Sequence, residues 1–381
     1  MSKQNIQLSD HFTVSRLLRF VLPSIGTMLF TSVYGIVDGL CVSNFVGKTA
    51  FAGVNLIWPV PMLIGTIGFM LGTGGSAIVG IALGERDGEK ADAYFSLFLA
   101  AALLAGSAFA VLGLLFLRPI GVLLGGRGEM LEYALRYGRI LLIGLPTFIL
   151  QNMFQSFFVT AEKPNLGFWV TVGAGVTNMV LDALFVGLFH WGIAGAAAAT
   201  VFSQYVSGIG LTVYTALRCR GLLPDVRSLR FDRQVLADIL DMSLLTCAQQ
   251  SAMNFGILLV QRLVDSFGPV TMAAFAAAVK IDSFAYLPVQ DFGNAFSTFV
   301  AQNYGARQRQ RIRRGFRDAT LVSAGFSALI SLLVCVFAQP LMRIFVQAGE
   351  VEVLAAGVRY LRIEGACYMG IGCLFLLYGF Y

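Results

Sequence analysis

The chain has 381 residues, of which 57% are hydrophobic and 13% charged, and its mean hydropathy is +0.76. This composition is too apolar for a soluble globular protein and too poor in charge for a disordered chain, so it indicates an integral membrane protein. The net charge of +6 does not indicate nucleic-acid binding, because the basic residues gather at the ends of apolar segments. No nucleic-acid partner is expected.

Apolar segments long enough to cross a bilayer as helices recur about ten times along the chain. They lack the alternation of barrel strands and many are more than twice as long, so they are predicted to be helical. In chain order the spans are placed at residues 18–45, 51–82, 93–117, 138–160, 166–189, 192–217, 237–264, 270–301, 318–346 and 360–381.

The distribution of the 27 lysines and arginines predicts the orientation of these spans. Most of them lie at one set of span ends, and by the positive-inside rule this places the amino terminus in the cytoplasm. The sequence therefore predicts a multi-pass protein of the bacterial inner membrane. The arginine-rich segment 307–317 is interpreted as part of this topology signal, with binding of anionic lipid headgroups as the alternative.

The second half of the chain repeats landmarks of the first. Gly84 and Arg86 fall on Gly305 and Arg307 when the sequence is shifted on itself, and with a small insertion Tyr137 falls on Tyr360. Such repeats are typical of secondary transporters. The fold predicted is all-α, with two pseudo-symmetric lobes of six spans each: an amino-terminal lobe at 1–217, a cytoplasmic linker at 218–236 and a carboxy-terminal lobe at 237–381.

The second copy ends in its fourth span. We expect that two helices of a twelve-span protein are missing from the sequence through truncation, and a genuine ten-helix protein is the alternative.

Two carboxylates interrupt apolar spans of the first lobe, Asp38 in the first span and Asp182 in the fifth. A charge at mid-bilayer costs about 2.5–3.5 kcal/mol even on the lenient insertion scale, so such acids indicate an ion or proton pathway by default. At a rise of about 1.5 Å per residue, Asp38 lies about 27 Å and Asp182 about 24 Å from the inner ends of their spans. Both acids are therefore expected in the outer half of the membrane.

Other polar residues are predicted at the same depth. Asn178 lies one turn before Asp182, and Thr200 shares a face of the sixth span with Gln204. Carboxylate, amide and hydroxyl oxygens suit Na⁺, and a carboxyl in an apolar pocket can exchange a proton, so the same residues could serve either ion. Asn178 and Thr200 could instead only form hydrogen bonds between helices.

Several segments together resemble the multidrug and toxic compound extrusion (MATE) family of antiporters. They are PSIGTMLFTSVYGIVDGLCVSNFVG in the first span, GTGGSAIVGIALGERDGEKA after the second, NMVLD in the fifth, GIAGAAAAT in the sixth and AQNYGARQRQR after the eighth. The resemblance implies two six-helix lobes around a central cavity that opens alternately to either side. It also implies a cation or proton site, Na⁺ if Na⁺ is the coupling ion, formed by Asp38, Asn178, Asp182 and Thr200.

Polar residues of both lobes are expected to line the substrate cavity. The seventh span offers amides but no acid at mid-helix, which speaks against the second-lobe acid of one branch of the family. Lys280 is expected to face the cavity together with Asp291, and an ion pair between Lys280 and Glu364 is the alternative. The cavity residues predicted are Tyr34, Gln204, Gln250, Asn254, Lys280 and Asp291.

The function predicted is export of amphipathic, cationic drugs or metabolites by alternating access, in exchange for Na⁺ or H⁺. No other cofactor is expected, and the chain is expected to act as a monomer in contact with membrane lipid. A flippase for lipid-linked oligosaccharides and an inactive truncated transporter are the alternatives. An enzyme is disfavoured, because the only histidines, His11 and His190, lie near span ends without a nucleophile motif or a metal cluster.

Overall fold

The protein is described here by a computed structural model, in which two compact units are separable: residues 26–244, and residues 1–25 with 245–381. We call them the amino-terminal and the carboxy-terminal unit. The predicted lobe boundaries stay a prediction, and nearly all of the predicted linker lies outside the described residues. The structure describes residues 22–23, 26–27, 30–31, 33–35, 37–39, 41–161, 163–218, 248, 251–252, 255–256, 259–260, 262–264, 266–346 and 349–380.

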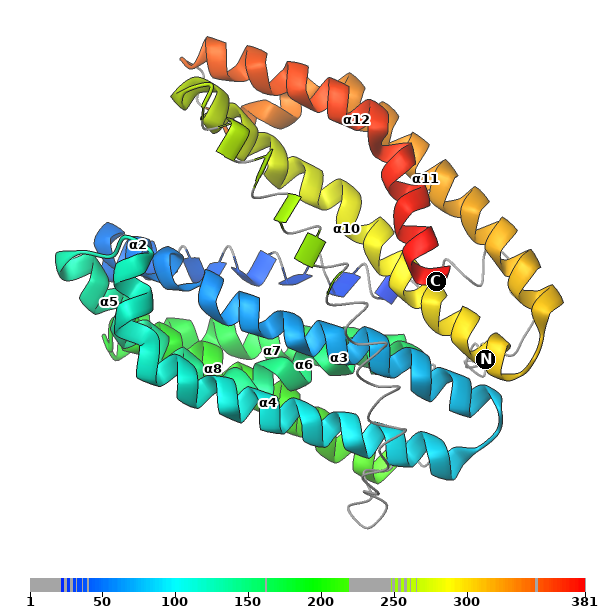
Figure 1. Ribbon diagram of the computed structural model, residues 1–381. Helices are drawn as coiled ribbons and strands as arrows, with labels where there is room; N and C mark the ends of the chain where they lie inside the picture. Colours follow the sequence, from blue (N-terminus) through cyan, green and yellow to red (C-terminus); the bar gives the residue numbers. More distant parts are fainter. Residues whose placement is uncertain are drawn as a thin grey trace. The chain divides into compact units, whose positions relative to one another are not determined.

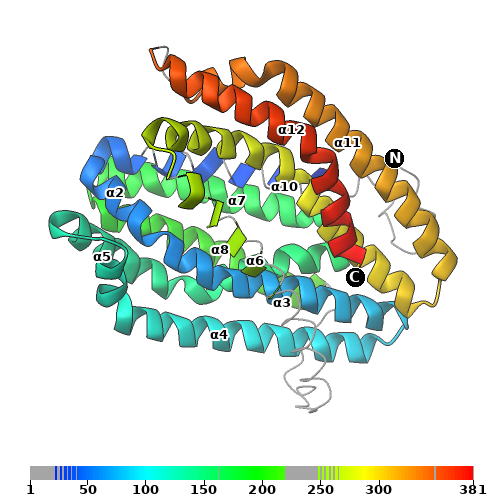
Figure 2. The same ribbon diagram turned by 45° about the horizontal axis from the view of Figure 1, so that its top comes forward.

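The amino-terminal unit is a bundle of helices (Figure 1), and within the described residues it contains no strand. The described residues of the first span are helical, and this span ends in a π-helical segment. Helices α3 and α4 run side by side in both views and are joined by a tight turn (Figure 2). The elements are η1 (Val42–Val46), α2 (Lys48–Ile57), α3 (Pro59–Gly84), α4 (Gly88–Leu123), α5 (Gly128–Ile143), α6 (Leu145–Thr160), α7 (Pro164–Asp182), η2 (Ala183–Leu188) and α8 (Ile193–Arg218).

The fourth predicted span is bent. Helices α5 and α6 meet at 60° around Gly144. Pro146 has no N–H to donate, and its ring excludes the carbonyl one turn back, so the helix cannot continue straight. The Tyr205 hydroxyl of α8 donates to the Ile143 carbonyl at 3.2 Å and so satisfies a backbone group that the bend leaves free. Gly106 of α4 lets the Pro146 backbone approach closely.

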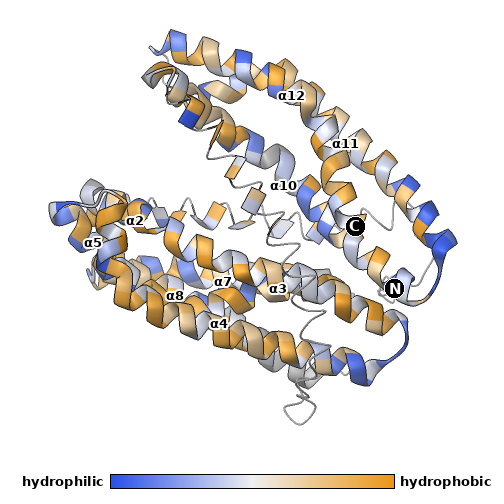
Figure 3. Ribbon diagram, in the orientation of Figure 1, coloured by the Kyte–Doolittle hydropathy of each residue, from blue (hydrophilic) through white to orange (hydrophobic). Residues whose placement is uncertain are grey.

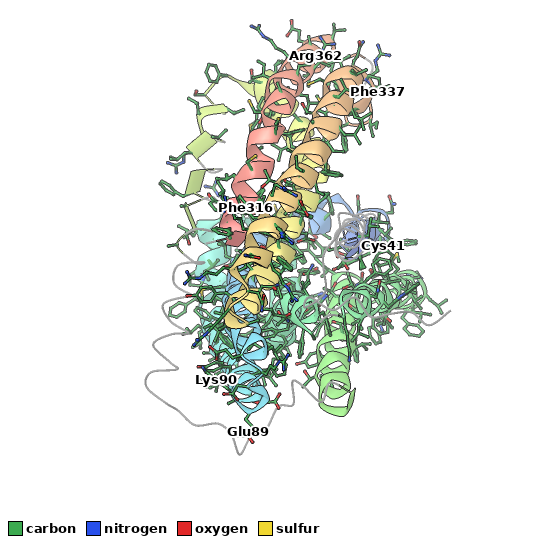
Figure 4. The ribbon with its side chains drawn as sticks, turned by 90° about the vertical axis from the view of Figure 1, so that its right-hand side faces the viewer. Cys41, Glu89, Lys90, Phe316, Phe337 and Arg362 are labelled. Carbon is green, nitrogen blue, oxygen red and sulfur yellow. The ribbon has the colours of Figure 1, made fainter. Side chains whose placement is uncertain are left out.

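The carboxy-terminal unit has three long helices, α10 (Pro269–Gly305), α11 (Arg309–Arg343) and α12 (Val351–Phe380). Helices α11 and α12 are antiparallel: Phe316 packs on Phe380 with ring centroids 4.9 Å apart, and at the other end the Cys335 thiol donates to the Arg362 carbonyl at 3.6 Å. Figure 4 shows Arg362 at one end of this unit and Phe316 toward the opposite end. Helix α12 also packs extensively on α10.

Six helices are long and apolar enough to cross a membrane, or seven if the bent pair counts as one span, in the part of the chain that the structure describes. Their hydrophobic surfaces alternate with polar turns between α3 and α4 and between α10 and α11 (Figure 3). At the first of these turns Lys90 donates to Glu85 at 3.3 Å, and this hydrogen bond raises the pKa of Lys90. The chain is thus a multi-pass helical membrane protein.

The internal repeat is visible in the backbone at these same two turns. Arg86 and Arg307, which coincide in the repeat, both adopt left-handed backbone angles, with φ of 62° and 54°. In each turn the N–H of the next residue reaches the helix carbonyl five positions back, at 3.1 Å and 2.9 Å, as in a Schellman cap. The spans before the turns, Thr49–Gly84 and Val270–Gly305, each have 36 residues.

Candidate functional site

Asp38 and Asp182 lie together inside the amino-terminal unit. Their carboxyl groups are within hydrogen-bonding range of each other. Asp182 is fully buried, and neither of its oxygens, nor Oδ1 of Asp38, has a hydrogen-bond partner among the described residues. Two ionised carboxylates cannot bond each other, because neither carries a hydrogen to donate. The pair therefore needs a proton or a cation between its oxygens.

Each acid precedes a π-helical segment. Segment η2 begins directly after Asp182, and η1 begins one turn after Asp38, with Cys41 between them. The two π segments contact each other, and both contact α8. Single turns of π-helix are rare and occur frequently at functional sites. The shared irregularity lies beside the two acids on both helices.

Tyr137 of α5 is the residue of this site that the sequence did not single out as functional. It is fully buried, its hydroxyl lies beside that of Thr200, and it is within electrostatic range of both Asp38 and Asp182. Its coincidence with Tyr360 in the repeat was the available signal. Thr200 donates to the Ala196 carbonyl of its own helix at 3.1 Å, which leaves its oxygen lone pairs free to accept a hydrogen bond or to bind a cation.

Asn178 and Tyr34 belong to the helices that carry the two acids. Asn178 is 2% exposed, lies one turn before Asp182, and its side-chain oxygen has no partner among the described residues. Tyr34 lies one turn before Asp38 and packs against α7 at Gly175, where an added Cβ would be 3.0 Å from its ring. This close approach at a glycine holds the first span against the helix of Asp182.

Oxygen atoms in this site fit both candidate ions. The described residues contain no group of three or more His, Cys, Asp or Glu side chains that could hold a metal, which argues against a transition-metal or zinc site. Two carboxyls, an amide and hydroxyls are oxygen ligands suited to a hard cation, and the facing carboxyls equally suit one shared proton. The residues Asp38, Asn178, Asp182 and Thr200 thus remain the prediction for the ion site.

An apolar pocket opens one helical turn away from this site. The pocket is lined by Trp58 and by residues of α3, α5, α6 and α8, among which Gln204 of α8 is the one with an amide side chain. Gln204 follows Thr200 by one turn on α8, and Leu141 follows Tyr137 by one turn on α5. The amide oxygen of Gln204 has no partner among the described residues. The same two helices therefore carry both the polar site and the pocket.

The predicted cavity residues of the second lobe are not brought together as a group. Gln250 and Asn254 lie outside the described residues. Lys280 is exposed, with its ammonium 6.0 Å from the centre of the Phe345 ring, a cation–π distance. The alternative ion pair with Glu364 is wrong: no ion pair in the described part of the chain includes either residue, because Glu364 faces another acid. Asp291 is 7% exposed and one of its oxygens has no partner within the described residues.

Comparison with protein families decides the identity of this arrangement. The MatE family model matches residues 23–184 and 244–381, most of the chain. The chain belongs to the MatE family. The all-helical, multi-pass fold agrees with this family, and the proteins named in it are transporters and not enzymes.

Curated relatives match most of the chain at low identity. The probable multidrug resistance protein YoeA of Bacillus subtilis is 26% identical over 93% of this chain and 77% of its own length. The multidrug export protein MepA of Staphylococcus haemolyticus is 21% identical over 94% of this chain and 79% of its own. An FAD transporter of Shewanella oneidensis is 25% identical over 86% of this chain and 74% of its own.

Solved MatE structures have the same fold. A crystal structure of MATE in the bent conformation superposes with a TM-score of 0.90 at 22% identity, and covers 100% of this chain and 85% of that chain. A MOP superfamily transporter from Pyrococcus furiosus gives a TM-score of 0.89 with the same identity and coverage. At this identity the likeness shows the fold alone.

Proposed function

We propose that the chain exports amphipathic, cationic small molecules across the membrane by alternating access, in exchange for Na⁺ or H⁺ bound between Asp38 and Asp182. The observation that carries this proposal is the facing of two buried carboxyls that lack a hydrogen-bond donor. An ion or proton at this point changes the charge of a closed, apolar site by one unit. Because charge in an apolar environment is costly, this change alters the relative stability of the two states of the transporter.

Coupling to the exported molecule follows from helices α5 and α8, which carry Tyr137 and Thr200 beside the acids and also line the pocket. Tyr137 and Leu141 lie on successive turns of α5, and Thr200 and Gln204 lie on successive turns of α8. A change in the distance between α5 and α8 at Tyr137 and Thr200 therefore also changes the pocket one turn further on, at Leu141 and Gln204. An antiporter requires that the ion and the substrate favour different states of the same helices, because a ligand shifts an equilibrium only by its differential affinity.

The lining of the pocket supports a substrate with an apolar or aromatic part. Trp58, Met62 and Phe148 offer apolar and aromatic surface. Aromatic faces attract organic cations, and methionine adapts to ligands of different shape. The relatives named for multidrug export agree with this substrate class.

The orientation belongs to the same proposal. We place the amino terminus and the basic turns at Arg86 and Arg307 on the cytoplasmic side of a bacterial inner membrane, in agreement with the positive-inside rule. Outward export of a cation then runs with the inward entry of Na⁺ or H⁺.

The experiment that tests this function is efflux of a fluorescent cationic dye such as ethidium from proteoliposomes under separate Na⁺ and H⁺ gradients. The unsubstituted chain is expected to export the dye under one of the two gradients. Asp182→Asn keeps the shape of the side chain but cannot ionise. Loss of a charged interaction worth about 1.5–3 kcal/mol lowers coupled efflux by roughly tenfold to a hundredfold.

Glu129→Gln is the matched control, because it neutralises an exposed acid of the same unit and leaves the site intact. Efflux of this variant is expected to equal that of the unsubstituted chain. Gradient-driven efflux that persists unchanged in Asp182→Asn would remove the ion site from the mechanism. A chain that moves the dye under neither gradient would contradict the antiport itself.

A further inference from the structure

We propose that the carboxy-terminal unit holds a second proton site, in which Asp282 of α10 and Glu364 of α12 share one proton. This inference rests on the proposed function only in treating the chain as proton- or cation-coupled. The site itself is argued from the packing of α10 on α12, and neither residue belongs to the site described above.

The two acids face each other across the helix interface. Their carboxyls are within hydrogen-bonding range, and Asp282 is only 5% exposed. The Tyr368 hydroxyl donates to Oδ1 of Asp282. Oδ2 of Asp282 and Oε2 of Glu364 remain buried without a partner among the described residues. One proton held between Oδ2 of Asp282 and Oε2 of Glu364 satisfies both orphaned oxygens at once.

The surroundings of the pair contain hydroxyls and a thiol but no positive charge that pairs with it. Tyr360, Glu364 and Tyr368 follow one another at single-turn spacing and form one face of α12. The Tyr360 hydroxyl lies beside Glu364, and from α11 the Cys335 sulfur lies 3.2 Å from where a Cβ on Gly365 would stand. In the described part of the chain no lysine or arginine forms an ion pair with either acid.

A proton fits this pair better than a metal cation. A hard cation needs several oxygen ligands that spread around it, whereas here one oxygen of Asp282 already accepts from a tyrosine. The described residues also contain no cluster of three acidic, histidine or cysteine side chains. Two bare carboxylates at this range in an apolar interface would repel each other strongly. The shared proton therefore bonds α10 to α12, and its departure separates the two side chains.

Infrared spectroscopy of the purified full chain in lipid tests this site directly, because a protonated carboxyl has a C=O stretch distinct from that of a carboxylate. In Na⁺-free buffer at neutral pH we expect such a band, and we expect both Asp282→Asn and Glu364→Gln to remove it. Tyr368→Phe keeps the shared proton but removes the hydrogen bond that Tyr368 donates to Asp282. The band should therefore shift but persist. The measurement is made in the Asp38→Asn/Asp182→Asn variant, in which the first acid pair has no carboxyl group and contributes no such band.

Asp291→Asn is the matched control, since it removes another buried carboxyl of α10 and leaves the pair untouched. The band assigned to the pair must survive in that variant. A spectrum unchanged by both Asp282→Asn and Glu364→Gln overturns the site, and so does loss of the band on adding Na⁺, which would assign the site to a cation. If either variant fails to fold, the Na⁺ and pH titrations of the Asp38→Asn/Asp182→Asn variant still decide. Loss of coupled efflux in Asp182→Asn together with an unchanged infrared spectrum would leave the proposed function standing and remove only this inference.

Discussion

The two units of the chain each contain a pair of facing carboxyls, but the residues that form the pairs differ. In each unit a pair of facing carboxyls comes from two different helices, and a tyrosine of the fourth span in the repeat lies beside the pair: Tyr137 in the first unit and Tyr360 in the second. The acids themselves do not correspond, since they belong to the first and fifth spans in one unit and to α10 and α12 in the other. The repeat therefore preserves the helix frame and the tyrosine, while each unit places its acids independently.

The fourth span shows how the same frame allows this difference. In the first unit it is bent by 60° at Gly144 and Pro146, and in the second unit α12 continues without a break over Val351–Phe380. The repeat places Cys367 and Met369 where the first unit has Gly144 and Pro146, so nothing interrupts the backbone hydrogen bonds there. An uninterrupted α12 carries Tyr360, Glu364 and Tyr368 on one face at single-turn spacing, whereas the fourth span of the first unit is divided into α5 and α6.

The largest expected difference between the units is in stability, and it concerns the contact between the second and fourth spans of each unit. An added Cβ on Gly293 would lie 2.4 Å from the Phe375 carbonyl oxygen, but on Gly72, its counterpart, 3.1 Å from Met153. Overpacking costs about 1–3 kcal/mol, so Gly293→Ala is expected near the upper end of that range and Gly72→Ala near the lower end. Thermal unfolding of the purified variants in one detergent measures the difference.

Gly325→Ala serves as the control for those variants, because a Cβ there meets nothing within 4 Å. This substitution is expected to leave the unfolding temperature unchanged or to raise it slightly, as alanine favours helix more than glycine does. Equal losses in Gly72→Ala and Gly293→Ala would show that the two contacts are equally tight and would break the comparison.

The tyrosines should separate the roles of the two acid pairs. Tyr137→Phe removes a buried hydroxyl that has no hydrogen-bond partner among the described residues and is free to contact the bound ion or proton. Loss of such a contact, worth about 1–1.5 kcal/mol, is expected to lower ion-coupled dye efflux by about tenfold. Tyr360→Phe is expected to have a smaller effect on efflux. Initial rates in proteoliposomes, normalised to reconstituted protein, provide the test. A larger loss in Tyr360→Phe would mean that the second unit carries the main coupling site.

Much of this architecture was predictable from the sequence because charge in an apolar span is rare. Asp38 and Asp182 were identified as a pair for that reason, and the helical class and the repeat followed from the apolar runs and the landmarks at their ends. The presence of Pro146 in the sequence did not by itself decide whether the fourth span bends. Proline occurs in many membrane helices without breaking them, and here the outcome depends on Gly106 and Tyr205, which are distant in sequence.

The second acid pair illustrates what sequence reasoning could not reach. Asp282 lies two positions from Lys280 and Glu364 lies 82 residues further on, so no local spacing relates the two acids. From the sequence, an ion pair between Lys280 and Glu364 is the alternative to a cavity-facing Lys280, because opposite charges are the usual partners in an apolar environment. The structure instead turns Lys280 toward Phe345 and leaves the two acids together. Which residue of α10 faces α12 depends on the rotation of α10 about its axis, and α10 and α12 approach closely at Gly293 and Gly379, which are distant in sequence.

The smallest expected effect concerns the two turns in which the units agree most closely. Arg86 and Arg307 have φ of 62° and 54°, and the left-handed conformation costs a non-glycine residue about 1–2 kcal/mol. Arg86→Gly and Arg307→Gly should therefore each stabilise the folded chain, by about 0.5–1 kcal/mol after the larger conformational entropy of unfolded glycine is subtracted. Arg86→Ala and Arg307→Ala remove the same charge but keep the strained backbone, so they should not raise the unfolding temperature. A gain in the alanine variants equal to that in the glycine variants would assign the effect to charge. A gain in only one of the two glycine variants would show that the turns, alike in backbone, differ in how firmly their helices are held.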